Sequence, residues 1–178
     1  MDLVARVDQF PKPGETRTGT EFGTYPGGKG ANQAVALARL GAGVRMAGKL
    51  GEDVFGSSYQ ETFEKEGVDG SIIQLVPGVS TGVAIIEVDK SGENHIIIVP
   101  GANGRMDRRY IESNIEAIAE ADYVLFQLEI PLETIQHTLE LLKERDTTAI
   151  LDPAPAPRSG LPRELLANVD LITPNESE

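Results

Sequence analysis

Apolar and polar residues alternate in two rhythms along this chain, and the rhythms predict where strands and helices lie. Residues 2–8 (DLVARVD) follow the two-residue period of a strand and end at the turn-forming segment PKPGE. Residues 31–41 (ANQAVALARLG) place alanine and valine at helical spacing, with Gly41 as the stop. From Ala36 onward helical and strand-like segments mostly alternate, which favours a parallel sheet with helices packed on it.

Two β-branched runs interrupt this alternation. Residues 81–89 (TGVAIIEVD) and 95–100 (HIIIVP) are joined by KSGEN, which predicts a hairpin. We expect the two β segments, roughly residues 2–25 and 80–99, to pair as a separate small sheet. Further helices are predicted over residues 57–67, 107–121, 131–145 and 162–169, and further strands over 44–51, 122–128, 148–152 and 170–175.

Composition narrows the classes of function. The 16 Lys and Arg residues against 28 Asp and Glu give a formal net charge of −12, which argues against nonspecific nucleic-acid binding because phosphate contacts need a basic surface. The chain has no cysteine, so cysteine-ligated zinc and thiolate nucleophiles are excluded. Its histidines, His95 and His137, lie far apart, which argues against a histidine metal site. No signal peptide or membrane span is visible, so we expect a cytoplasmic protein.

Residues 25–34 (YPGGKGANQA) set a lysine among glycines at the start of a predicted helix. A nucleotide phosphate loop needs Ser or Thr directly after its lysine to ligate magnesium, whereas Gly30 follows Lys29 here. A dinucleotide fingerprint needs a third glycine where Gln33 stands, and a strand running into the first glycine where Pro26 stands. The residues therefore exclude both kinds of loop.

Two interpretations of the glycine cluster stay open on spacing alone. Gly27, Gly28 and Gly30 allow close approach of a ligand to the backbone. Lys29 and Asn32 supply polar groups at a helix N-terminus, which suits an oxygen-rich ligand. The other interpretation is a tight structural turn, with Asn32 as the helix cap and Lys29 in solvent.

The segment GGKGANQA resembles the first signature of the ribokinase family of carbohydrate kinases (the PfkB group). FPKPGET is similar to the lid segment of that family, and STGVAIIEVDKSGENHIIIVPGAN is similar to its second lid segment and the following turn. LFQLEIPLE resembles its strand ending in a sugar-binding glutamate, and ITPNESE contains its Asn-x-x-Glu motif. The matches run from residue 2 to residue 178 in the order of the family.

The resemblance implies a ribokinase-like three-layer α/β/α fold, with a mostly parallel sheet and a small β lid, as one incomplete domain over residues 1–178. The residues that it assigns to sugar binding are Asp2, Gly28, Lys29, Asn32 and Glu129. It also implies that Asn175 and Glu178 lie beside the nucleotide phosphates, with Glu178 acting on magnesium through a bound water.

Within the family, Lys29, Ala31 and Gln33 together favour ribokinase, which implies phosphorylation of the 5-hydroxyl of D-ribose by ATP with Mg²⁺. The family motif Asp-Thr-x-Gly-Ala-Gly-Asp, which carries the catalytic base and the anion hole, is absent, and LGAGVR at residues 40–45 lacks the acid. The strand that precedes Asp2 in the family, its adenine site and its K⁺ loop also have no counterpart. We therefore expect a chain truncated at both ends, with no catalytic residue and no activity by itself.

Other functions compete with this one. The chain could be a non-catalytic sugar-binding or assembly module, or part of a kinase for another sugar of the family. A nicotinamide-dependent dehydrogenase is disfavoured by the missing third glycine. Because the lid segments form a dimer clasp in the family, the resemblance also implies a homodimer through residues 2–25 and 80–99. The expected partners are a small sugar and ATP, with neither nucleic acid nor membrane.

Overall fold

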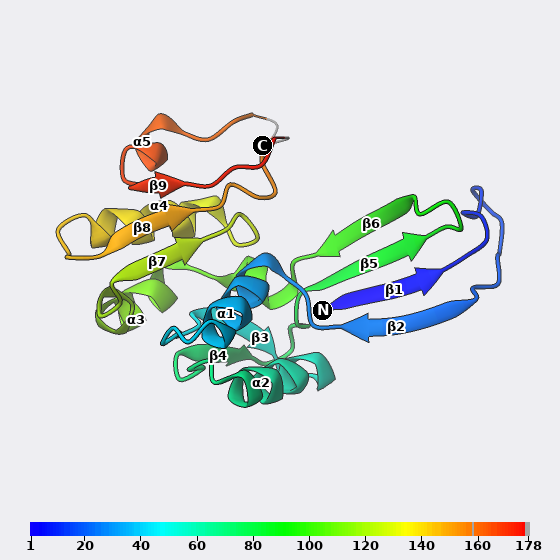
Figure 1. Ribbon diagram of the computed structural model, residues 1–178, viewed down its shortest axis with the longest axis horizontal. Coiled ribbons are helices and arrows are strands. Elements are labelled where there is room, and N and C mark those ends of the chain that lie inside the picture. The colour runs from blue at the N-terminus through cyan, green and yellow to red at the C-terminus, as the bar shows by residue number, and fades with distance from the viewer. Residues whose placement is uncertain (158, 177–178) are drawn as a thin grey trace.

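The computed structural model of the chain describes residues 1–157 and 159–176 (Figure 1). Its strands are β1 (Asp2–Arg6), β2 (Glu21–Tyr25), β3 (Gly48–Gly51), β4 (Ile73–Val76), β5 (Val83–Val88), β6 (Asn94–Val99), β7 (Tyr123–Phe126), β8 (Thr148–Leu151) and β9 (Leu171–Ile172). Its helices are α1 (Lys29–Arg39), α2 (Val54–Glu66), α3 (Arg108–Ala119), α4 (Leu132–Leu142), α5 (Arg163–Leu166) and the 3₁₀ helix η1 (Gly101–Arg105).

A mixed sheet is built from the two β segments that the sequence analysis expected to pair. Its strand order is β2-β1-β5-β6. β1 pairs antiparallel with β2 and parallel with β5, and β5 pairs antiparallel with β6 as the predicted hairpin. In Figure 1 this sheet extends away from the helices, and β1 begins at the end nearest to them. Asp2 is therefore held at the junction between the small sheet and the rest of the chain.

The other strands form parallel sheets, one of β3-β4 and one of β7-β8-β9. Helices α2, α4 and α5 connect the consecutive parallel strands, as parallel pairing requires. The α/β class with mostly parallel sheets is thus confirmed. No strand was predicted from the sequence at β4, and the alternation of helices and strands favoured one parallel sheet. Among the described residues β3-β4 and β7-β8-β9 are not hydrogen-bonded to each other, so the parallel strands form two sheets.

Helix α1 begins earlier than the apolar pattern predicted. Its first residue is Lys29, and Gly28 precedes it with a φ of 80°, a left-handed conformation that suits glycine. No side chain of α1 caps the helix. The interpretation of Asn32 as the helix cap is therefore wrong, because Asn32 lies inside the first turn and its amide donates to the Gly28 carbonyl at 3.0 Å.

Two hydrophobic clusters hold these elements together. The larger one joins α3, α4, β7 and β8, and it contains Ile135, Leu139 and Leu151, which are fully buried. Each such side chain contributes about 1.5–3 kcal/mol by leaving water. The smaller cluster packs α1 and α2 around β3 and includes Tyr59 and Phe63. Packing thus brings the N-terminal half of α2 next to the glycine turn that precedes α1.

Candidate functional site

Glu129, in the turn after β7, reaches the start of α1. Its Oε2 accepts a hydrogen bond of 2.7 Å from the backbone amide of Lys29. The first amides of a helix have no partner within the helix, and the helix dipole favours a negative charge there. Glu129 is half-buried and precedes α4, which starts at Leu132 and carries Glu133 in its first turn.

Asp2 and Glu129 lie beside adjacent glycines. Gly27 is buried, and a Cβ placed on it would overlap the carboxylate of Asp2. A Cβ on Gly28 would lie 3.6 Å from Oε2 of Glu129. The structure therefore brings together Asp2, Gly28 and Glu129, along with the backbone of Lys29, around one glycine turn. Only glycine at position 27 leaves room for the Asp2 carboxylate at this distance.

The phenol of Tyr59, in α2, lies at the same turn. Its hydroxyl donates to the carbonyl of Gly27 at 2.9 Å and accepts from the amide of Gly27 at 3.0 Å. Burial raises the pKa of Tyr59, and the carboxylates of Asp2 and Glu129 add to this rise against the hydrogen bond from Gly27. Sequence reasoning missed Tyr59, because a buried aromatic in an amphipathic helix has the pattern of an ordinary core residue.

A chain of polar side chains continues the site along the ends of the parallel strands. The side-chain amide of Gln127 donates to Oε1 of Gln33, and Nε2 of Gln33 donates to Oδ2 of Asp152 at 2.8 Å. Gln127 and Asp152 directly follow β7 and β8, where α/β proteins bind ligands. That position is the signal by which the sequence could have identified them.

Lys29 and Asn32 are the polar residues expected at the start of α1. Lys29 is half-buried and Asn32 is exposed. Neither side chain makes a hydrogen bond or ion pair with the residues that the structure describes. Both start from the first turn of α1, so their polar ends are available to a ligand at the glycine turn.

The two residues expected at the nucleotide are near the C-terminal end of the sequence. Asn175 is exposed beyond β9, at the carboxyl end of a parallel strand. Glu178 lies outside the described residues. In residues 1–157 and 159–176 no group of three or more His, Cys, Asp or Glu side chains is arranged to hold a metal ion. No described helix is both long and apolar enough to cross a membrane.

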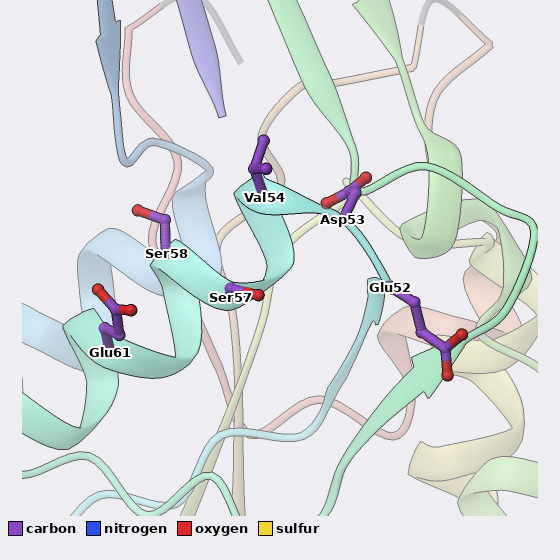
Figure 2. A pocket seen from close by; sticks show the side chains of 6 residues that line it. All are labelled: Glu52, Asp53, Val54, Ser57, Ser58 and Glu61. Carbon is purple, nitrogen blue, oxygen red and sulfur yellow. The ribbon is translucent and has the colours of Figure 1, made fainter.

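A separate hollow lies beside the start of α2 (Figure 2). Its lining residues are Glu52, Asp53, Val54, Ser57, Ser58 and Glu61. Burial opposes ionisation of Asp53, but hydrogen bonds from the amide and hydroxyl of Thr81 and the amide of Gly56 outweigh it and lower the pKa of Asp53. Because Asp53 is engaged by the protein and the other charged lining residues are acidic, this hollow does not suit a phosphate or another anion.

The comparisons with known proteins find similarity along the whole chain. The profile of the pfkB family carbohydrate kinase matches residues 1–178. The ribokinase of Bacillus subtilis (strain 168) is 43% identical over 178 residues, which cover 100% of this chain and 60% of that protein.

Solved structures extend this similarity to the fold. The ribokinase of Thermotoga maritima matches with a TM-score of 0.87 and 44% identity, over 99% of this chain and 57% of that one. The Arabidopsis thaliana ribokinase, solved with ribose and ATP, matches with a TM-score of 0.89 and 33% identity, again over 99% and 57%. The chain thus spans 57–60% of the length of these relatives. With its full length matched by the family profile, the chain belongs to the pfkB family of carbohydrate kinases.

Proposed function

We propose that the whole protein transfers a phosphoryl group from ATP to the 5-hydroxyl of D-ribose, and that this chain supplies the sugar site. The observation that carries the proposal is the position of Asp2 and Glu129 at adjacent glycines of one turn. Relatives that are 33–44% identical to this chain over the matched region are named ribokinases. The Arabidopsis relative is described with both ribose and ATP, the two substrates of the proposed reaction.

The free acceptors at the turn suit a small polyhydroxyl ligand. Asp2 makes no side-chain hydrogen bond to the described residues, and Glu129 uses only Oε2 within them. The second oxygen of Glu129 and both oxygens of Asp2 can therefore accept from sugar hydroxyls. Lys29 and Asn32 add donors from α1. A site of paired donors and acceptors discriminates strongly, because a sugar lacking a hydroxyl leaves a protein group unpaired.

Asn175 and Glu178 are proposed to lie at the nucleotide and its Mg²⁺. Magnesium is commonly held by one or two carboxylates together with substrate phosphates, rather than by a cage of protein ligands. Bound Mg²⁺ would neutralise charge on the phosphates, and we propose that Glu178 contacts it through water. A K⁺ site is expected outside these 178 residues.

The catalytic base is proposed to come from another part of the protein. No Asp-Thr-x-Gly-Ala-Gly-Asp string occurs in the 178 residues. A base must lie within hydrogen-bonding reach of the attacking hydroxyl. Asp2 and Glu129 are proposed to bind sugar hydroxyls, so neither is proposed as the base. On this proposal the chain alone binds sugar without turning it over, in the cytoplasm where ATP is supplied.

We also propose a homodimer that forms through the small sheet. Register pairs Ile85 with Ile97 and Val83 with Val99, which puts these side chains on one face. Ile97 is 62% exposed, and Ile85 and Val99 are each 41% exposed. Contiguous exposed aliphatic side chains on a sheet favour association with a second copy. Light scattering on the natural full-length protein would give a dimer mass, and Ile97→Lys would shift it toward monomer. A monomer at all concentrations would contradict this.

A coupled assay of ADP release tests the kinase function in the natural full-length protein with Mg²⁺ and K⁺. D-Ribose should stimulate ADP release well above the rate without sugar, and 2-deoxyribose, fructose and adenosine serve as competing substrates. A preference for one of these would assign another sugar of the family. No stimulation by any of them would refute the kinase proposal.

The missing base motif favours a second candidate, a non-catalytic sugar-binding or assembly module. It predicts ribose binding by calorimetry without ADP release, in the full-length protein as well as in this chain. The kinase proposal instead predicts ADP release by the full-length protein. Tight binding of NADH would instead support the disfavoured dehydrogenase.

A further inference from the structure

One buried hydroxyl engages both backbone groups of a single residue in the glycine turn. Tyr59 is 5% exposed, and its hydroxyl donates to the Gly27 carbonyl at 2.9 Å and accepts from the Gly27 amide at 3.0 Å. Neither the sugar-binding residues nor the phosphoryl transfer proposed above use this group. Its two hydrogen bonds hold the turn to helix α2.

Gly27 is the point at which a small movement would disturb both carboxylates. It lies against the Asp2 carboxylate, and the next residues meet Glu129, which is 3.6 Å from a Cβ on Gly28 and bonded to the Lys29 amide. Gly27 also follows β2 and precedes α1, so it connects the small sheet to the helices. A shift of this residue would therefore change the spacing between Asp2 and Glu129.

Helix α2 holds a second connection to the small sheet. Asp53, which caps α2, accepts hydrogen bonds of 2.7 Å from both the amide and the hydroxyl of Thr81. Thr81 is buried and lies just before β5. Helix α2 thus bonds to two segments next to the small sheet. Tyr59 bonds to the segment that follows β2, and Asp53 bonds to the segment that precedes β5.

We propose that Tyr59 is a positioning residue for sugar binding, whose hydroxyl holds Gly27 so that Asp2 and Glu129 are spaced for the sugar. This inference rests on the proposed function. Without the hydroxyl, the amide and the carbonyl of Gly27 would both be buried and unpaired, and the turn would relax to satisfy them. Phenylalanine keeps the ring in the core and removes only the hydroxyl.

Tyr110, in α3, provides a matched control. It is also 5% exposed, and its hydroxyl also joins two backbone groups. It accepts from the Gly48 amide at 2.9 Å and donates to the Ile72 carbonyl at 2.6 Å. Gly48 is the first residue of β3 and Ile72 directly precedes β4, so neither hydrogen bond involves Gly27. Tyr110→Phe therefore removes an equivalent pair of buried hydrogen bonds without removing one to Gly27.

The experiment compares Tyr59→Phe and Tyr110→Phe in the natural full-length protein. Both substitutions should lower the melting temperature. Tyr59→Phe should raise the KM for ribose about three- to tenfold with kcat changed less than about twofold, as expected when a net hydrogen-bond contribution to binding is lost. Tyr110→Phe should leave the KM for ribose unchanged. Amide hydrogen exchange over residues 25–32 should accelerate in Tyr59→Phe alone.

Equal KM values for ribose and equal exchange over residues 25–32 in the two variants would overturn the inference, while ribose turnover by the wild type would still support the proposed function. If the wild-type protein phosphorylates no sugar, the proposed function fails. The exchange comparison then still decides whether Tyr59 holds the glycine turn, because it does not depend on turnover.

Discussion

Oε2 of Glu129 accepts a hydrogen bond of 2.7 Å from the backbone amide of Lys29, 100 residues earlier in the sequence. The contact joins the end of β7 to the start of α1 and places a carboxylate at a helix N-terminus, where the dipole stabilises it. It leaves the second carboxylate oxygen for a ligand. One residue thus has both a structural role in α1 and a proposed role in binding sugar.

Glu129→Ala should weaken both functions of this carboxylate. We expect a loss of stability of about 1–3 kcal/mol from the unpaired amide of Lys29 and a rise in the KM for ribose of at least about tenfold. Urea unfolding and steady-state kinetics measure the two effects. Glu133→Ala is the control, because Glu133 is exposed in the first turn of α4 and away from the glycine turn. Unchanged ribose KM in Glu129→Ala would remove Glu129 from the sugar site.

Asn32→Ala should separate binding from stability. The Asn32 side chain is exposed and has no hydrogen bond to the described residues, so its removal should change the free energy of unfolding by less than about 0.5 kcal/mol. Ribose binding should weaken by about 1–3 kcal/mol because a sugar hydroxyl loses its partner. Calorimetry with ribose measures this, and unaltered affinity would leave Asn32 as a surface residue of α1.

Gly27→Ala should disrupt the glycine turn by overpacking. The added Cβ would overlap the Asp2 carboxylate in a buried position. We expect a destabilisation of about 1–3 kcal/mol together with loss of ribose binding. Gly43→Ala is the matched control, since a Cβ there meets nothing within 4 Å. Urea midpoints that fall equally in both variants would show that the overlap with Asp2 does not lower the free energy of unfolding.

The ion pair of Asp69 should make a small, pH-dependent contribution to stability. The hydrogen bond from Arg45 at 2.7 Å, followed by those from Ser71, lowers the pKa of Asp69 to about 2. A carboxylate with a lowered folded pKa stabilises the protein above its unfolded pKa of about 3.9, and this stabilisation is lost as the pH falls through about 2. Both side chains are more than a third exposed, so solvent screening limits the gain to less than about 1 kcal/mol.

Asp69→Asn therefore should lower the urea midpoint slightly at pH 7, and the difference from wild type should shrink between pH 4 and pH 2 (about the two pKa values). The measurement is a series of urea unfolding curves across that range. A difference that stays constant down to pH 2 would mean that another property of asparagine, such as its altered hydrogen bonding to Ser71, causes the change.

Glu178→Gln should affect turnover more than sugar binding. If Glu178 contacts Mg²⁺ through water, the loss of its charge should lower kcat and raise the Mg²⁺ concentration needed for half-maximal rate, with the KM for ribose nearly unchanged. Magnesium titrations of the initial rate test this. An effect confined to the KM for ribose would contradict the assignment.

Most of the local elements and the residue types of the glycine turn could be predicted from the sequence. Periodicity predicted the helices and the hairpin of β5 and β6, because helical and strand spacing are properties of neighbouring residues. The glycines around Lys29 and the missing hydroxyl and third glycine excluded two classes of nucleotide loop, since those loops need particular residues at fixed local positions. The ordered motifs then indicated the family that the comparisons confirm.

Which side chains meet at the turn depends on contacts between residues that are distant in the sequence. The partners of Gly27, Lys29 and Gln33 lie 32, 100 and 119 residues away, in Tyr59, Glu129 and Asp152. No local pattern encodes such pairs, because they depend on how α1, α2 and the ends of β7 and β8 pack. The start of α1 differs from the predicted start for the same reason. A carboxylate from another element satisfies its first amide, so the helix begins at Lys29 without a capping side chain of its own.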